Sequence, residues 1–142
     1  MSASDYDAQK DVARANRDFY RSFERLDLAA MRAVWLDDER IQCIHPGAEA
    51  LIGPARVHAA WETIFRSTTW IRFELADVAV QVFGELAWVT VLERIHSKAD
   101  DQSPETLVAE ALATNLFARK DGAWKLLLHH ASPLARRILR EP

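Results

Sequence analysis

Apolar residues in the first half of the chain recur at the spacing of helices. Over residues 5–26 they stand three, four or seven positions apart, which predicts one long amphipathic helix. The recurring positions are Val12, Phe19, Phe23 and Leu26, with Ala8 and Ala15 beside them. Asp27 can cap a second, short helix over residues 28–35. Gly53 and Pro54 open a third helix, with proline in its favoured first turn.

Four long stretches in the second half are instead rich in β-branched and aromatic residues. They cover residues 70–83, 86–97, 106–119 and 124–132, and turns at 84–85, 98–105 and 121–122 separate them. Consecutive strands joined in this way predict an antiparallel meander. One more strand is predicted earlier, over residues 40–45, because Pro46 and Gly47 follow it as a stop signal.

The alternation of apolar residues changes phase within residues 70–83. The apolar positions are odd-numbered in the first half of this stretch and even-numbered in the second. They are Ile71, Phe73 and Leu75, followed by Val78, Val80 and Val82. Because side chains alternate strictly along a strand, the change predicts a bulge near Ala76 and Asp77, and bulges bend sheets. We therefore expect a curved sheet.

The order of elements is helix, helix, strand, helix and four strands, which is typical of the α+β class. With 142 residues, of which 49% are hydrophobic, the chain has the size and composition of one domain, and we assign residues 1–142 to it. The net charge of -3 is spread along the chain without a basic stripe, so we expect no nucleic-acid partner.

Three features indicate a cytoplasmic protein. The N-terminal residues are too charged for a signal peptide, and no apolar run approaches the ~18 residues of a membrane span. The single cysteine, Cys43, cannot form an internal disulfide, which fits a reducing compartment. Cys43 could be a nucleophile, although a lone buried cysteine is more often a small hydrophobic residue.

Three segments carry a resemblance to a known family. They are CIHPG at 43–47, LIGP at 51–54 leading into a tryptophan-bearing helix, and ATNLFARKDGAW at 113–124 running into HHASP. With the order of elements, they resemble the SnoaL-like and ketosteroid isomerase-like members of the nuclear transport factor 2-like superfamily over nearly the whole chain. The resemblance implies a cone-shaped, curved antiparallel sheet wrapped around N-terminal helices and enclosing a small apolar pocket. It selects no activity, because this fold serves isomerases, dehydratases, cyclases and non-catalytic domains.

The resemblance also implies where an isomerase would keep its catalytic groups. The base aspartate falls on His45, the helix tyrosine on or near Phe19, and the protonated aspartic acid on Asn115 or its neighbour. All three have changed. A lost hydrogen-bond donor of this kind costs about 2.7–4 kcal/mol of transition-state stabilisation, so we expect no steroid isomerase activity.

Strand alternation predicts which side chains face the pocket. In the last strand Lys125 should face water, which turns Trp124, Leu126, Leu128 and His130 inward and His129 outward. Glu93 shares its parity with apolar residues and should also face inward. Residues 106–119 leave two choices, and the resemblance favours the one that turns Asn115 and Phe117 inward.

The opposite face of the sheet would then be apolar. Its residues are Trp88, Leu92, Leu112 and Leu116. A face this apolar should be covered, most simply by a second copy of the chain, so we expect a homodimer through the outer face of the sheet.

Two groups of polar residues are candidates for chemistry. His45 stands at a strand end, where an imidazole could act as a base near neutral pH or simply hold the turn. Glu93 and His130 could pair, with the carboxylate orienting the imidazole, or form a satisfied polar pair in the pocket wall.

Aromatic residues are the candidates for ligand contacts. Trp35, Trp61 and Trp124 could stack on a flat ligand, although tryptophans at helical spacing are more often core. Phe19, Asn115 and Phe117 are the other candidates for ligand contacts. No metal is expected, because adjacent strand histidines point to opposite faces and no HExxH-type spacing occurs.

Two functions follow. The first is a cofactor-free enzyme of the isomerase, dehydratase or hydrolase type, which moves a proton on a small, mostly apolar molecule with His45, Glu93 and His130 as acid and base. The second is a non-catalytic module that binds a ligand or only dimerises.

Overall fold

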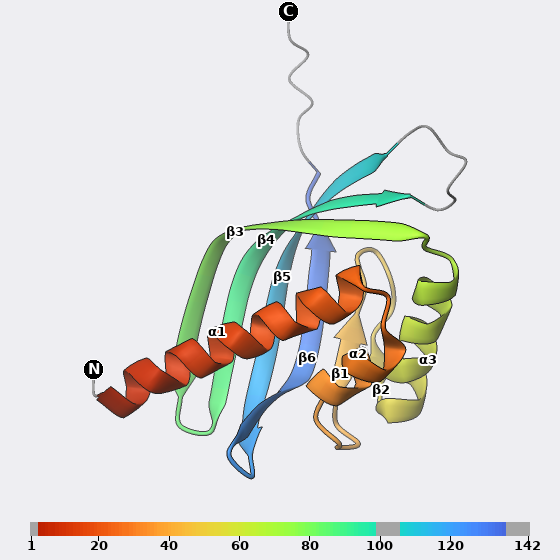
Figure 1. Ribbon diagram of the computed structural model, residues 1–142. Coiled ribbons are helices and arrows are strands. Elements are labelled where there is room, and N and C mark those ends of the chain that lie inside the picture. Colours follow the sequence, from red (N-terminus) through yellow and green to blue (C-terminus); the bar gives the residue numbers. More distant parts are fainter. Residues whose placement is uncertain (1–2, 99–105, 136–142) are drawn as a thin grey trace, which may run out of the picture.

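In the computed structural model, which describes residues 3–98 and 106–135, three helices pack on one face of a six-stranded sheet (Figure 1). The helices are α1 (Ala3–Glu24), α2 (Leu28–Val34) and α3 (Pro54–Arg66). The strands are β1 (Gln42–Ile44), β2 (Leu51–Ile52), β3 (Trp70–Phe83), β4 (Leu86–Lys98), β5 (Leu107–Lys120) and β6 (Ala123–Pro133). Across the sheet they lie in the order β2-β1-β6-β5-β4-β3.

The predicted helices and the four long strands are confirmed. The bounds of β3 to β6 differ from the predicted ones by at most one residue at either end. Asp27 caps α2 as expected, because its Oδ1 accepts the N–H of Ala30 at 3.0 Å. The predicted turn between β4 and β5 lies largely in 99–105, outside the described residues. None of the described helices is both long enough and apolar enough to cross a membrane.

The sheet is mixed rather than antiparallel throughout. The strands β3 to β6 form the predicted antiparallel meander, but β1 pairs with β6 in parallel. The resemblance implied an antiparallel sheet, and the parallel pair of β1 and β6 is the exception. The two-residue strand β2 was not predicted, and it pairs with β1 at the sheet edge through Cys43 and Leu51.

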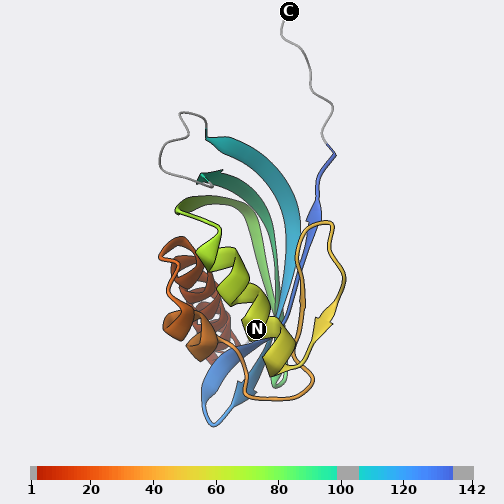
Figure 2. The same cartoon turned by 90° about the vertical axis from the view of Figure 1, so that its right-hand side faces the viewer.

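Two bulges decide which way the sheet bends and which side chains face inward. The first, between Ala76 and Ala79 of β3, confirms the predicted one, and Asp77 there has a φ of 54°. Figure 2 shows the long strands curling over the helices. The second lies in β6, where Leu116 pairs with Leu128 but the next residue of β5 pairs with Leu126. Leu127 is thus an extra residue, which reverses the alternation after it.

The second bulge makes one prediction wrong. Trp124 and Leu126 face inward as expected, but after the bulge His129 faces the interior and His130 faces solvent. The three consecutive leucines at 126–128 concealed the change, because every one of them suits an apolar face.

Aromatic rings fill the space between the helices and the sheet. Phe19 and Trp61 are fully buried, and their ring centroids lie 5.7 Å apart. Phe23 lies 4.8 Å from the ring of Trp61 and 4.8 Å from that of Phe73 in β3. Edge-on contacts of this kind add to the burial of the rings, and they fix α1 and α3 against the sheet.

We predict that Phe19→Ala lowers the free energy of unfolding by about 3–5 kcal/mol, because it leaves a cavity among packed rings. Phe83→Ala is the matched control, since Phe83 is 77% exposed, and it should change stability by less than about 0.5 kcal/mol. Urea denaturation of both variants measures the difference. Equal losses would show that the aromatic cluster does not hold the helices in place.

Candidate functional site

Five polar side chains meet in the interior between α1 and the sheet. They are Asn16 and Tyr20 of α1, Glu93 of β4, Asn115 of β5 and His129 of β6, and none is more than 3% exposed. We call these five residues the buried polar network. A buried polar group that lacks a partner destabilises the fold, so the hydrogen bonds among them decide whether the network can exist.

The Asn115 side chain is the centre of the network. Its Nδ2 donates to Asn16 Oδ1 at 2.8 Å and to the Tyr20 hydroxyl at 3.1 Å. The Tyr20 hydroxyl in turn donates to Glu93 Oε2 at 2.5 Å. On the other side, His129 Nδ1 lies 2.6 Å from Asn115 Oδ1. One continuous chain of hydrogen bonds therefore runs from the Glu93 carboxyl to the His129 ring.

The roles of the atoms follow from this pattern. Because Nδ2 of Asn115 donates twice, Oδ1 is an acceptor, and His129 Nδ1 must carry a hydrogen. In a neutral imidazole the other nitrogen, Nε2, then has a free lone pair. His129 is thus held in one tautomer.

Burial shifts the pKa of each titratable group in the network. Desolvation raises the pKa of Glu93 from 4.5 to about 7, although its bond from Tyr20 opposes the change. Desolvation, reinforced by the nearby carboxyl of Glu93, also raises the pKa of Tyr20. Desolvation lowers the pKa of His129 to about 3, so its ring is neutral at pH 7. The carboxyl of Glu93 is therefore the group in the network that changes charge near neutral pH.

His45 lies next to the network, just beyond the end of β1. Its ring centroid is 4.9 Å from that of Trp61 and 6.3 Å from that of His129. Its Nε2 lies 3.4 Å from the sulfur of Cys43, and burial lowers the pKa of the imidazole. Burial, followed by the charge of Glu93, raises the pKa of the Cys43 thiol, which argues against a nucleophilic thiolate.

One buried donor beside His45 has no partner. The indole Nε1 of Trp61 is buried, and no acceptor lies within hydrogen-bonding distance of it. Native proteins leave few such groups unpaired, and each calls for an explanation such as a bound water or ligand. The Nε1 of Trp35, at the end of α2, is unpaired in the same way.

A small cavity reaches the network from the surface. It has a volume of about 160 Å³, lies between α1 and β3, and Tyr20 and Phe73 form part of its wall. Of five cavities lined by described residues, none is lined by Glu93, His45 or His129. Among these five cavities, the one between α1 and β3 is lined by a member of the network, Tyr20.

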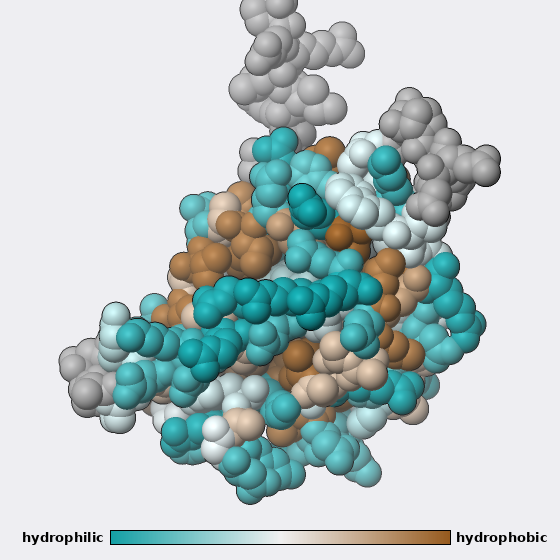
Figure 3. Space-filling view, in the orientation of Figure 1, coloured by the Kyte–Doolittle hydropathy of each residue, from teal (hydrophilic) through white to brown (hydrophobic). Residues whose placement is uncertain are grey.

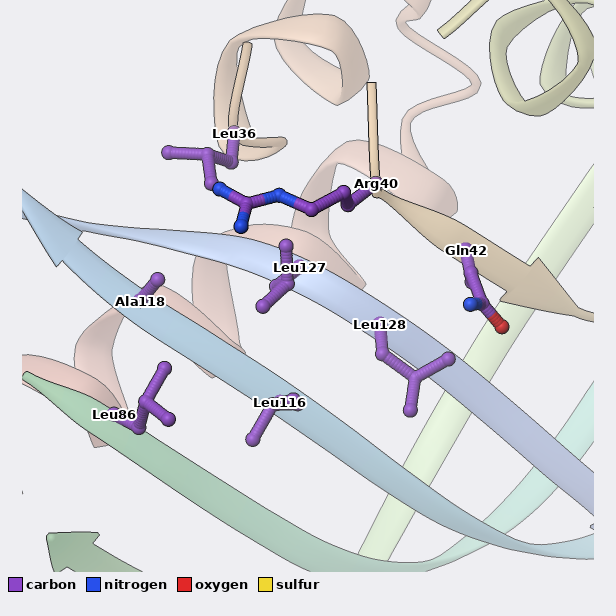
Figure 4. A pocket seen from close by; sticks show the side chains of 8 residues that line it. All are labelled: Leu36, Arg40, Gln42, Leu86, Leu116, Ala118, Leu127 and Leu128. Carbon is purple, nitrogen blue, oxygen red and sulfur yellow. The ribbon is translucent and has the colours of Figure 1, made fainter. Parts of the chain in front are cut away.

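A larger groove of about 390 Å³ lies on the opposite face of the sheet (Figure 4). Leucine side chains line it from β4, β5 and β6, together with Leu36, Arg40 and Gln42. The guanidinium of Arg40 makes two bonds of 2.9 Å to the Asp38 carboxylate, so its charge is already paired. The groove is therefore apolar in character.

Within residues 3–98 and 106–135, no three His, Cys, Asp or Glu side chains stand close enough together to hold a metal ion.

Comparison with known proteins places this geometry in a family. The model of the SnoaL-like domain matches residues 12–136, which include every residue of the network. The chain belongs to the SnoaL-like domain family. This SnoaL-like domain also has the fold of the nuclear transport factor 2-like superfamily, as the resemblance predicted.

Three solved structures show how far the likeness extends. A candidate dehydratase of the NTF2-like family from Streptomyces avermitilis is 34% identical, with a TM-score of 0.84, over 91% of this chain and 97% of that one. A candidate calcium/calmodulin-dependent protein kinase type II association domain from Thiobacillus denitrificans is 33% identical, with a TM-score of 0.73, over 84% and 92%. A ketosteroid isomerase-like protein from Erwinia carotovora atroseptica shares the fold, at 18% identity and a TM-score of 0.74 over 90% and 97%.

One curated relative is a longer protein. The F-box protein SKIP8 of Arabidopsis thaliana is 26% identical over 127 residues, which make up 89% of this chain and 51% of that protein. The SnoaL-like domain thus spans about half the length of this relative.

The structure brings together most of the predicted site residues of the SnoaL-like domain. Glu93, Asn115 and Phe117 face the interior as predicted, and the resemblance chose the correct face of β5. Phe19, Trp35 and Trp61 are buried in the core. Trp35 also lines a surface cavity of about 470 Å³, on the side of the molecule near Lys120 and Lys125. The ring of His45 lies against that of Trp61.

His130 does not belong to the site, and its predicted pairing with Glu93 is wrong. It is exposed on the outer side of β6, because the bulge at Leu127 reversed the alternation. The carboxyl of Glu93 bonds Tyr20 instead. Tyr20, Asn16 and His129 were missed. Tyr20 stands one position beyond Phe19 on α1 and places a phenol in the interior, where the resemblance had suggested none.

We predict that Glu93→Gln removes a pH dependence from the stability of the SnoaL-like domain. Because the folded protein raises the pKa of Glu93 from 4.5 to about 7, protonation stabilises the fold below pH 4.5, and this stabilisation disappears as the pH rises through 7. The variant should match the wild type near pH 4.5 and exceed it by up to about 3 kcal/mol near pH 8, since one pKa unit corresponds to about 1.4 kcal/mol.

Denaturant titrations of both proteins between pH 4.5 and 8 give this difference. His129 has a lowered pKa and loses stability as the pH falls, but it contributes to both proteins and cancels. Exposed Glu49→Gln is the control. A difference between wild type and Glu93→Gln that does not grow with pH would mean that Glu93 has an ordinary pKa.

Proposed function

We propose that this SnoaL-like domain binds a small, mostly apolar molecule beside the buried polar network and moves a proton on it without a cofactor. The observation that carries the proposal is the Tyr20–Glu93 pair, a phenol and a carboxyl 2.5 Å apart with the carboxyl pKa near 7. A general acid or base works best when its pKa lies near the working pH. Strongly shifted carboxyls in apolar surroundings are typical of catalytic sites.

The unpaired donor supports a ligand site over a purely structural core. A folded core with no further task would be more stable with apolar side chains in place of a buried carboxyl and a buried imidazole. The Trp61 Nε1 is buried without an acceptor, beside His45 and within 6.3 Å, ring to ring, of His129. A carbonyl or hydroxyl oxygen of a bound molecule would satisfy this donor.

Two residues of the network, Tyr20 and Glu93, and the neighbouring His45 would carry out the reaction. Tyr20 would donate a hydrogen bond to an oxygen of the substrate, and the protonated Glu93 would then donate to the Tyr20 oxygen. His45 would take a proton from the carbon next to a carbonyl. Burial lowers the pKa of its imidazole, so the ring is neutral at pH 7, and the ring lies against Trp61. In an isomerisation His45 would return this proton to another carbon of the substrate. In a dehydration the C–O bond would break instead, and the departing hydroxyl would take up a proton and leave as water. The S. avermitilis relative, a candidate dehydratase, favours this class.

Binding requires a ring to move. Phe19 and Trp61 are fully buried and fill the space between the buried polar network and His45. The cavity of about 160 Å³ at Tyr20 is the place where we expect a ligand to enter. A molecule that displaces Phe19 would reach both Tyr20 and Trp61.

Exchange of carbon-bound hydrogen for deuterium tests the proposal without knowledge of the product. We predict that the protein accelerates exchange next to the carbonyl in at least one member of a panel of small ketones and oxo acids in D2O, followed by proton NMR. Tyr20→Phe and Glu93→Gln should each lower the rate about 100-fold, the usual effect of removing one such donor or acid. His130→Gln should leave it unchanged, because His130 faces solvent.

Two results would contradict the assignment. One is exchange that proceeds equally well in the Tyr20→Phe and Glu93→Gln variants. The other is no acceleration with any compound although circular dichroism shows a folded protein, which would favour a non-catalytic module.

A second function is favoured by the outer face of the sheet, where we propose that two copies of the domain pack together. Trp88 is 39% exposed and Leu112 is 49% exposed on this face, next to the leucine-lined groove of Figure 4. Monomeric proteins rarely leave such a continuous apolar surface to water. The T. denitrificans relative, a candidate association domain, is consistent with an assembly role.

We predict that the wild type has the mass of a dimer by light scattering at micromolar concentration and that Leu112→Asp shifts it to the monomer. A charge at the centre of an apolar interface is costly to bury. Tyr6→Asp, at a residue 54% exposed on α1, should leave the dimer intact. A wild type that is monomeric would contradict this assembly.

A cytoplasmic location is also part of the proposal. It is supported by Cys43, a buried free thiol, which is typical of a reducing compartment.

A further inference from the structure

We infer that the molecule bound by this domain carries a carboxylate, which Arg17 and Arg21 hold at the opening of the cavity between α1 and β3. The inference rests on the proposed function, because that cavity leads to Tyr20. It adds the charge of the ligand, which the buried polar network alone does not define.

Two arginines of α1 stand over this cavity. Arg17 and Arg21 are four positions apart, so their side chains project from the same face of the helix, and both line the cavity with Tyr20. The guanidinium group presents donors in a planar fork that matches a carboxylate. Two such groups one turn apart can bind one carboxylate from two sides.

Neither arginine forms a strong ion pair with an acidic side chain of the described residues. Within the described part of the chain, no acidic side chain pairs with Arg17. Arg21 approaches Asp18 at 4.0 Å, but both side chains are more than half exposed, and such pairs contribute little. Both guanidinium groups can therefore bind an anion at the opening of the cavity.

The acid that also lines the cavity is already engaged. One oxygen of Glu24 accepts the backbone N–H of Phe73 at 2.9 Å. This bond ties the carboxylate to the free edge of β3, where an unpaired N–H would otherwise be exposed. The residues that line the cavity therefore carry two positive charges and one negative charge, an excess of one positive charge. Figure 3, in which α1 crosses the front, shows a hydrophilic band along that helix.

The rest of the cavity suits a short apolar body. Phe73 and Leu75 of β3 form its wall opposite α1, and the ring of Tyr20 lies 5.1 Å from that of Phe73. Its volume of about 160 Å³ has room for a small molecule only. A carboxylate held by the arginines would place a body of this size against Tyr20, so the chemical class is a small oxo acid or hydroxy acid.

Benzoate and benzamide test the inference, because they share their shape and differ in charge. We predict that benzoate, added to the 15N-labelled protein at pH 7 and low salt, shifts the amide signals of Phe73 and Leu75, and that benzamide binds at least about tenfold more weakly. Arg17→Gln and Arg21→Gln should each weaken benzoate binding roughly three- to fivefold, as expected for partly exposed ion pairs. Salt at 0.5 M should weaken it in the wild type as well.

Arg14→Gln is the matched control, since Arg14 is exposed on the same helix and does not line the cavity. Equal affinities for benzoate and benzamide, or equal losses in Arg14→Gln and Arg17→Gln, would overturn the inference. A third result would also overturn the inference: the protein exchanges the hydrogen of a neutral ketone, but benzoate does not shift its Phe73 signal. The proposed function would survive that result. Arginine-dependent binding of benzoate without exchange of any compound would instead support the carboxylate site and overturn the proposed catalysis.

Discussion

The Asn115 amide joins the two halves of the interior. Its nitrogen donates toward α1 and its oxygen accepts from β6, so one planar group fixes Tyr20, Asn16 and His129 in a single arrangement. If the amide were reversed, its N–H group would face the N–H of His129 Nδ1, and neither could accept a hydrogen bond from the other. Tyr20 and Asn16 would lose the N–H groups that donate to them. The direction of the Tyr20 hydroxyl, and with it the bond to Glu93, depends on this orientation. The helix and the sheet thus constrain each other through polar as well as aromatic contacts.

A bulge of one residue determines which histidine belongs to this network. The bulge in β3 could be predicted, because apolar and polar residues alternate there and the phase visibly changes. The bulge in β6 could not, since residues 126–128 are all leucine and give no parity signal. His129 and His130 were interchanged for this reason alone. Glu93 was placed correctly because β4 pairs regularly along its length.

The remaining differences also have local causes. The order of the helices and of the meander strands could be predicted from periodicity, and the family from three short segments. Asn16 and Tyr20 could have been recognised by their spacing of four on α1, but a polar residue within an apolar stripe gives no hydrophobic signal. The parallel pairing of β1 with β6 could not be predicted, because an apolar pattern marks a face and not a neighbour.

The central claim is that the interior is a binding site and not only a core, and the indole nitrogen of Trp61 reports on it most directly. A crystal structure of the purified protein at high resolution would show what lies beside this atom. We predict density for a water or a small molecule within about 3 Å of Trp61 Nε1, the distance of a hydrogen bond to oxygen. A dry, closed contact among Phe19, Trp61 and His45, with the nitrogen unpaired, would contradict the claim.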